Sequence, residues 1–267
     1  MNQNIFQINA FTTTPFSGNP AAVCILDTPK DTSWMQRMAQ EMNQPVTAFV
    51  SPRKNNKYEL YWFTPTTELN LCGHGTLGSA HILWEQKHVN PDECIQFHTK
   101  SGLLPVKQVN EGIQLDFPAN PVQKTEVPAE LEQAIQVPFR NVVKNMLGYI
   151  VEVETEEVVK KLEPNLDLLS LIPVTGIIVT SLSSSPDFDF ISRYFAPRIG
   201  INEDPVTGSA HCGLGPYWSE KLQKKRLIGY QASYRGGKVN VELVENRVLL
   251  TGQALTIFQG KLILPSC

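Results

Sequence analysis

The sequence predicts an α+β fold made of two similar, pseudo-duplicated lobes. Most apolar segments alternate with period two, as half-buried strands do, and only a few longer segments suit helices. In addition, several blocks of the first half recur in the second half in the same order. A chain of 267 residues can form two such lobes. We place them at residues 1–118 and 119–267, with the last strand able to return to the first lobe.

In the first half, Thr32 or Ser33 is expected to cap a helix that runs to about Met42. A second helix is expected to follow the glycine-rich turn 71–78 and to end near Trp84. The proline-rich stretch from residue 118 to residue 128 predicts a linker. Alternating apolar residues predict strands at 5–11, 21–26, 58–63, 94–98, 103–109 and 113–117.

In the second half, one helix is expected to start near Gly208 and to end near Lys225. A loop is expected at residues 183–186. Strands are predicted at 146–153, 176–180, 193–195, 229–234, 239–244, 247–250 and 256–264, and the later ones form hairpins.

The duplication rests on three blocks. The tetrapeptide Gly-Ser-Ala-His occurs at 78–81 and again at 208–211, an offset of 130. An aromatic strand ending in Phe-x-Pro precedes each copy, at 62–65 and at 194–197, an offset of 132. A hairpin follows each copy at an offset of 135, in which the matching positions are Gly102, Val106, Val109, Ile113 and Leu115 against Gly237, Val241, Val244, Val248 and Leu250. Two copies of one unit account for this order.

Composition argues against several classes of protein. There are 23 basic and 26 acidic residues and no basic run, so a nucleic-acid partner is not expected. No apolar stretch is long enough to span a membrane, and the N-terminus does not resemble a signal peptide. The five cysteines are scattered without metal-binding spacing, which favours reduced thiols, a cytoplasmic location and no metal.

Both predicted glycine-rich turns open a helix, where backbone N–H groups without a partner attract a carboxylate or phosphate. His74 lies between glycines in the first turn and Asp204 precedes the second, so both are candidates for proton transfer. Thr76 and Ser209 carry hydroxyls that can donate to an anion. Cys72 is either a thiolate at a helix start or a small buried residue.

Three motifs carry a family resemblance: residues 17–23 (Ser-Gly-Asn-Pro-Ala-Ala-Val), 71–76 (Leu-Cys-Gly-His-Gly-Thr) and 203–210 (Glu-Asp-Pro-Val-Thr-Gly-Ser-Ala). They resemble the signatures of the PhzF family of phenazine-biosynthesis-type isomerases, in the right order over nearly the whole chain. The resemblance implies a diaminopimelate-epimerase-like fold, in which each lobe is a curved, mostly antiparallel sheet wrapped around a central helix. It also implies an isomerase without a cofactor, a small carboxylate substrate bound between the lobes, and a cytoplasmic homodimer.

By the same resemblance, His74 and Asp204 are the catalytic residues. Substrate contacts are expected at Gly73, Gly208 and Ser209, with Asn19 and Thr76 as further candidates. One position departs from the family: in the segment 43–50, Val46 stands where the family has an acid/base glutamate.

That departure leaves three alternatives open. Asp204, Cys72 or Glu41 is the base in place of the glutamate; or the reaction differs; or the protein binds a small molecule without turning it over. A cysteine at residue 72 opposite Thr207 also resembles the amino-acid dehydratases and epimerases of the same wider fold.

Overall fold

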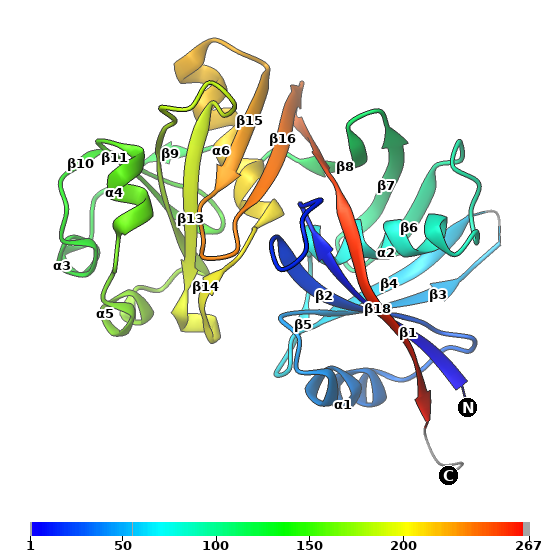
Figure 1. Ribbon diagram of the computed structural model, residues 1–267. Helices are drawn as coiled ribbons and strands as arrows, with labels where there is room; N and C mark the ends of the chain where they lie inside the picture. The colour runs from blue at the N-terminus through cyan, green and yellow to red at the C-terminus, as the bar shows by residue number, and fades with distance from the viewer. Residues whose placement is uncertain (1, 55, 264–267) are drawn as a thin grey trace. The chain divides into compact units, whose positions relative to one another are not determined.

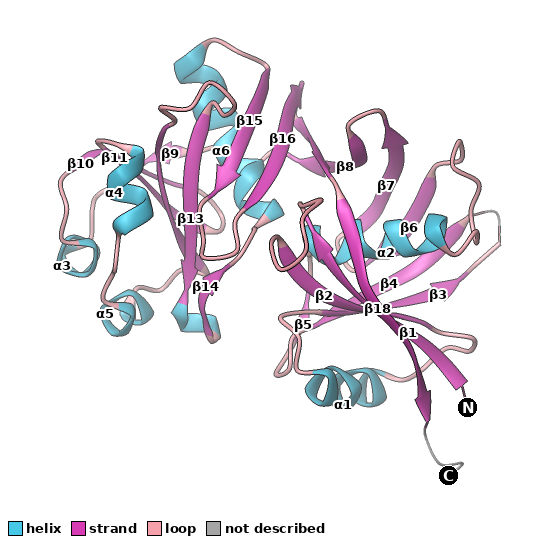
Figure 2. Ribbon diagram, in the orientation of Figure 1, coloured by secondary structure: helices cyan, strands magenta, loops and turns pink. Residues whose placement is uncertain are grey.

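The computed structural model describes residues 2–54 and 56–263 and divides into two compact units. One unit comprises Met1–Asp116 together with Thr251–Cys267, and the other comprises Phe117–Leu250. Strands are far more abundant than helices in both units (Figure 2), as an α+β fold requires. Leu264, the expected end of the last strand, and Cys267 lie outside the described residues.

The first unit wraps its strands around one buried helix, α2 (Gly73–Glu85). Apart from His81 and Glu85, every residue of α2 is buried, as expected for a helix that is apolar on all faces. The second helix, α1 (Thr32–Met42), lies on the other side of the same strands (Figure 1). The strands are β1 (Asn2–Ala10), β2 (Asn19–Ile25), β3 (Thr47–Pro52), β4 (Lys57–Phe63), β5 (Glu68–Leu69), β6 (Ile95–Thr99), β7 (Gly102–Val109), β8 (Gly112–Pro118) and β18 (Ala254–Ile263).

The second unit repeats this plan around α6 (Gly208–Leu222). Its strands are β9 (Gln123–Lys124), β10 (Phe139–Lys144), β11 (Gly148–Val153), β12 (Gly176–Leu182), β13 (Phe190–Ala196), β14 (Ile201–Asp204), β15 (Arg226–Gln231), β16 (Gly237–Val244) and β17 (Arg247–Gly252). Short helices pack with the strands in one apolar core: α3 (Ala129–Ile135), α4 (Glu156–Lys161) and α5 (Leu166–Leu171), and a 3₁₀ turn spans Pro197–Ile199.

Strand pairing confirms the duplication. In the first unit β1–β2 is antiparallel, β2–β3 parallel, β3–β4 antiparallel, β4–β6 parallel and β6–β7 antiparallel. In the second unit β10–β11, β11–β12, β12–β13, β13–β15 and β15–β16 follow the same sequence of directions. The strand after each hairpin pairs with the first strand of the other copy: β9 with β10, and β18 with β1 (Figure 1).

The repeated tetrapeptide does not mark equivalent positions, although the duplication is correct. Residues 208–211 open α6, whereas residues 78–81 lie in the middle of α2, which begins at Gly73. The helix starts are therefore related by Gly73 and Gly208, at the offset of 135 that also relates the hairpins. Small residues recur along both helices because both are closely packed, and this produces a chance match in the wrong register.

Two other expectations need correction. The cap of α1 is neither Thr32 nor Ser33 but Asp31, whose Oδ1 accepts the N–H of Trp34 at 2.8 Å. The stretch expected to be a plain linker contains β9, which forms a short antiparallel pair with β10.

Candidate functional site

The first half-site is the N-terminus of α2. Cys72 is the capping residue, and its Sγ accepts the N–H of Gly75 at 3.4 Å. Gly75 has to be glycine, because a Cβ there would lie 2.8 Å from Cδ1 of Trp62 and 3.2 Å from Sγ of Cys72. The turn thus packs directly on β4, the aromatic strand that precedes it in the sequence.

His74 lies one residue inside this helix end and is buried. Nδ2 of Asn19 lies 3.3 Å from its Nδ1, and Sγ of Cys72 lies 3.5 Å from the same nitrogen. Asn19 comes from the start of β2, directly after Gly18, whose φ of 70° and contact with the carbonyl of Ala10 exclude a side chain. The first two sequence motifs therefore meet at the imidazole of His74.

Thr76 uses its hydroxyl within the helix. Its Oγ1 donates to the carbonyl of Cys72 at 2.6 Å, and the side chain is fully buried. This bond satisfies a backbone group of the turn and directs the hydroxyl back along the helix. Donation from this hydroxyl to a substrate would require it to leave the carbonyl of Cys72.

Val46 and Glu41 have different surroundings. Val46 is buried next to β2, where its carbonyl accepts the N–H of Ala22 at 2.9 Å. Ala22 is three residues from Asn19 on the same strand, a distance of roughly 10 Å. Glu41 is an exposed residue near the end of α1. A valine at 46 is a buried apolar side chain and cannot transfer a proton.

The second half-site is the N-terminus of α6. Asp204 ends β14, is buried, and accepts a hydrogen bond on Oδ2 from Oγ1 of Thr207 at 2.5 Å. Gly208 and Ser209 form the first turn of the helix, where backbone N–H groups have no acceptor within the helix. Gly208 is buried and the side chain of Ser209 is half-buried. The arrangement offers a carboxylate beside N–H donors, which suits proton transfer next to a bound anion.

Gln231 holds this turn together and was not predicted from the sequence. It is fully buried at the end of β15. Its Oε1 accepts the N–H of Thr207 at 2.8 Å, and its Nε2 donates to the carbonyl of Asp204 at 2.7 Å and to Oγ1 of Thr207 at 3.2 Å. A single glutamine in a strand carries no distinguishing pattern, so only the folded structure reveals these contacts.

The two histidines of the repeated tetrapeptide have different surroundings. Nδ1–H of His211 donates to the carbonyl of Thr207 at 2.9 Å, and burial lowers the pKa of His211 to about 4. His81 is partly buried, and Nε2 lies 3.0 Å from Oγ1 of Thr256. Burial lowers the pKa of His81, and nearby Glu85 partly opposes this. His211 is therefore a neutral residue of the core at neutral pH.

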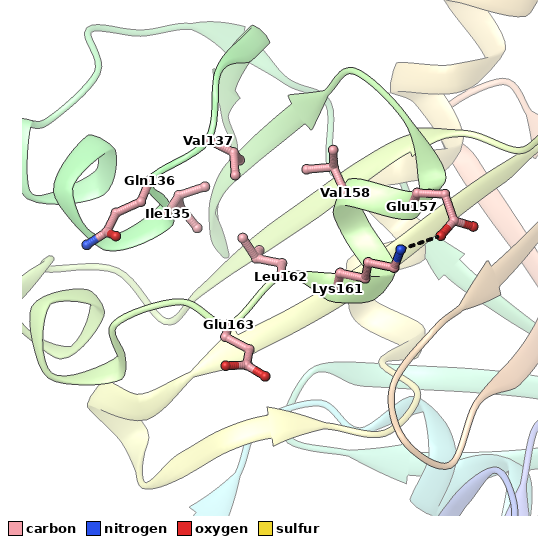
Figure 3. A pocket seen from close by; sticks show the side chains of 8 residues that line it. All are labelled: Ile135, Gln136, Val137, Glu157, Val158, Lys161, Leu162 and Glu163. Carbon is pink, nitrogen blue, oxygen red and sulfur yellow. Dashed lines mark ion pairs between the residues drawn. The ribbon is translucent and has the colours of Figure 1, made fainter.

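One surface depression of the second unit is separate from these residues. It has a volume of about 400 Å³ and lies between α3 and α4 (Figure 3). Apolar side chains line it together with a Lys161–Glu157 ion pair of 3.5 Å at its edge. None of the predicted site residues is among those that line it.

Among the described helices, none combines the length and the apolar character needed to cross a membrane.

Comparisons with known proteins agree with this architecture. The model of the family described as phenazine biosynthesis-like protein, PhzC-PhzF, matches residues 8–260. A protein of Halalkalibacterium halodurans named as an uncharacterized isomerase is 50% identical over 99% of this chain and 100% of its own. A crystal structure of a PhzF-family phenazine biosynthesis protein from Enterococcus faecalis is 36% identical, with a TM-score of 0.93 over 99% of this chain and 100% of that chain. A predicted epimerase from Pseudomonas aeruginosa, 19% identical over 98% of this chain and 100% of that chain, shares the fold with a TM-score of 0.75.

Proposed function

Because the chain belongs to the PhzC-PhzF family of phenazine biosynthesis-like proteins, we propose that it is an isomerase that needs no cofactor and moves a proton on a small carboxylate substrate. The name of the relative at 50% identity, an uncharacterized isomerase, supports the reaction class. One observation carries the proposal: each unit has a buried titratable side chain, His74 or Asp204, at the N-terminus of its central helix.

In this proposal Asp204 and His74 exchange protons with the substrate, because a buried carboxylate and a neutral imidazole can each accept and return a proton. The N–H groups at Gly73 and Gly208, with the hydroxyl of Ser209, hold the substrate carboxylate. We further propose that the protein acts as a homodimer in the cytoplasm, which sedimentation of the purified protein and cell fractionation would test.

The identity of the group that replaces the glutamate is part of the proposal. Val46 is an apolar residue, and Glu41 is exposed at the end of α1. Cys72 is the alternative with a specific observation in its favour, since its sulfur accepts a helix N–H and lies 3.5 Å from Nδ1 of His74. A helix N-terminus favours the thiolate form of a cysteine, as does an imidazole once it is protonated. An epimerase-like or dehydratase-like reaction that uses Cys72 is therefore the second candidate function.

Proton exchange in deuterated water tests the reaction class. Purified protein is incubated with a panel of small amino, hydroxy and cyclic-diene carboxylates, and deuterium at carbon is followed by NMR. We expect at least one substrate class to exchange, and Asp204→Asn to abolish the exchange. The matched control is Asp167→Asn, which removes an exposed carboxylate on α5 and should leave exchange unchanged.

The other outcomes separate the alternatives. Exchange that survives Asp204→Asn but is lost in Cys72→Ser assigns the proton to the thiol and favours the second candidate. Ligands that raise the melting temperature without any exchange would instead indicate a binding protein that retains the fold and has lost the chemistry.

A further inference from the structure

Gln231 uses its whole side-chain amide on the turn that carries Asp204. The side chain is fully buried, and all three bonds stated above go to Asp204 and Thr207. Each of its two N–H groups donates to one acceptor, and its carbonyl oxygen accepts from one donor.

The partners fix which way the amide points. The backbone N–H of Thr207 can only donate, so the atom facing it at 2.8 Å is the oxygen Oε1. The backbone carbonyl of Asp204 can only accept, so the atom facing it at 2.7 Å is the nitrogen Nε2. A flipped amide would place like groups against each other at both positions, each at the cost of a buried unsatisfied group.

The orientation of the amide in turn fixes the hydroxyl of Thr207. The second N–H of Nε2 points at Oγ1 of Thr207, which must therefore accept. The hydroxyl hydrogen is then directed at Oδ2 of Asp204, 2.5 Å away. Although Thr207 is the capping residue of α6, its side chain makes no capping bond to the helix, so its hydroxyl serves the carboxylate instead.

We propose that Gln231 is a positioning residue for proton transfer: through Thr207 it holds Asp204 as a carboxylate. Oδ2 permanently accepts a hydrogen bond, which stabilises the ionised form and makes protonation at that oxygen unfavourable. The inference rests on the proposed function in one respect, because that function assigns proton transfer to Asp204. We call the hydrogen bonds from Gln231 to Thr207 and from Thr207 to Asp204 the relay. All three side chains of the relay belong to one unit.

Ionisable groups beside Asp204 in its own unit include Tyr194, Arg193 and Glu203. Tyr194 pairs with Asp204 across β13 and β14, and burial together with the charge of Asp204 raises the pKa of its phenol. Glu203 precedes Asp204 and is paired with Arg193, with 2.6 Å between Nε and Oε1. Tyr194 is therefore a neutral phenol at neutral pH, and Glu203 and Arg193 compensate each other's charge.

The test is a titration of the Asp204 carboxyl by carbon-13 NMR on the full chain, with the resonance assigned by its loss in Asp204→Asn. Thr207→Val keeps the shape of the side chain and removes the hydroxyl, and Gln231→Met keeps the length and removes the amide. In each variant we expect the midpoint of the carboxyl to rise by about one pH unit, a tenfold weaker acid, because a hydrogen bond to a charged group is worth about that much. Thr207→Ser keeps the donor and should restore the midpoint.

The double variant distinguishes a relay from a purely structural role. If Gln231 acts through the hydroxyl, Gln231→Met should add little to the midpoint once Thr207→Val is present. Midpoints that stay at the wild-type value in both folded single variants, or shifts that simply add in the double variant, would overturn the relay. If Gln231→Met fails to fold, Gln231→Asn replaces it, since the shorter amide cannot reach both acceptors.

Failure of the proposed reaction remains separable from failure of the relay. The titration requires no substrate, so it reports on Gln231 even if no carboxylate in the panel exchanges. Conversely, exchange that depends on Asp204 with unshifted midpoints in the Thr207 and Gln231 variants would keep the isomerase proposal and discard the relay.

Discussion

Nδ2 of Asn19 lies 3.3 Å from Nδ1 of His74 and fixes the tautomer of that ring. An amide nitrogen donates and does not accept, so Nδ1 is the accepting nitrogen and the ring proton resides on Nε2. The N–H at Nε2 is therefore the group that a neutral His74 can offer to a ligand. The short motif around Asn19 thus contacts the histidine of a second motif more than 50 residues away.

Asn19→Asp should reverse this tautomer. A carboxylate accepts and does not donate, so it should draw the ring proton to Nδ1. Nitrogen-15 NMR of the histidine ring distinguishes the two tautomers, with His74→Gln used for assignment. Asn19→Leu is the control, since it removes the donor without supplying an acceptor. An Nε2–H tautomer that persists in Asn19→Asp would mean that another contact holds the ring.

Gly75→Ala should destabilise the protein by about 1–3 kcal/mol, because the new Cβ would lie 2.8 Å from Cδ1 of Trp62. At a helix position with free space, a change from glycine to alanine would stabilise the protein by about 1 kcal/mol. A loss of stability in Gly75→Ala would therefore show that the new Cβ collides with its neighbours. Urea unfolding gives the free energy. Gly260→Ala is the matched control, since its Cβ would meet only ordinary contacts at 3.7 and 3.9 Å.

Glu156→Gln should cost about 1–2 kcal/mol at pH 7. Lys160, together with the backbone N–H of Ser184 and the hydroxyl of Ser183, lowers the pKa of Glu156 to about 2. The folded pKa lies below the unfolded value, so this stability is present above the unfolded pKa and is lost as pH falls towards 2. Denaturation curves of the two proteins should therefore converge at acid pH.

The control for that experiment is Glu157→Gln. Glu157 is exposed and lies 3.9 Å from the ammonium of Lys160 and 3.5 Å from that of Lys161. Exposed pairs of this kind contribute little, so its loss should change stability by less than about 0.5 kcal/mol at any pH. Equal effects of the two substitutions would mean that the buried contacts of Glu156 add nothing.

Val46→Glu should create proton exchange on a phenazine-type dihydro-hydroxyanthranilate. The substitution supplies the carboxylate that the family resemblance expects at this position, and a buried glutamate is a suitable general acid or base. Val46→Gln tests whether a proton is needed, since it matches the shape without an ionisable group. If the natural protein exchanges this substrate as fast as Val46→Glu does, the reaction does not require a glutamate at position 46.

The parts of the fold with a clear period were predictable. Tyr58, Leu60 and Trp62 alternate on one buried face of β4, and the hairpins after each central helix align at one offset. Strands buried on both faces were harder: β3 lacks the polar alternation that marks a strand, because all but its last residue are buried. Short helices such as α4 and α5 are too brief for a helical period to emerge.

The candidate site was predictable where a turn needs glycine and a helix begins. His74 and Asp204 both lie at such turns, and each stands out as a titratable residue there. Gln231 did not stand out, because its role depends on β15 ending beside a turn more than 20 residues earlier in the chain. Pairing at that sequence distance is set by the fold and leaves no local pattern.

The exchange of end strands has a consequence for how the chain folds during synthesis. The first unit contains a strand synthesised long after its other strands, since β18 pairs along the whole of β1. Until the ribosome has released β18, β1 presents one edge of unpaired N–H and C=O groups, which is a template for association with other chains. Closing this pair joins residues about 250 positions apart, so it is a slow, entropically costly step. The N-terminal half of this protein therefore depends on the synthesis of β18, and a chain terminated before that strand would carry an open sheet edge.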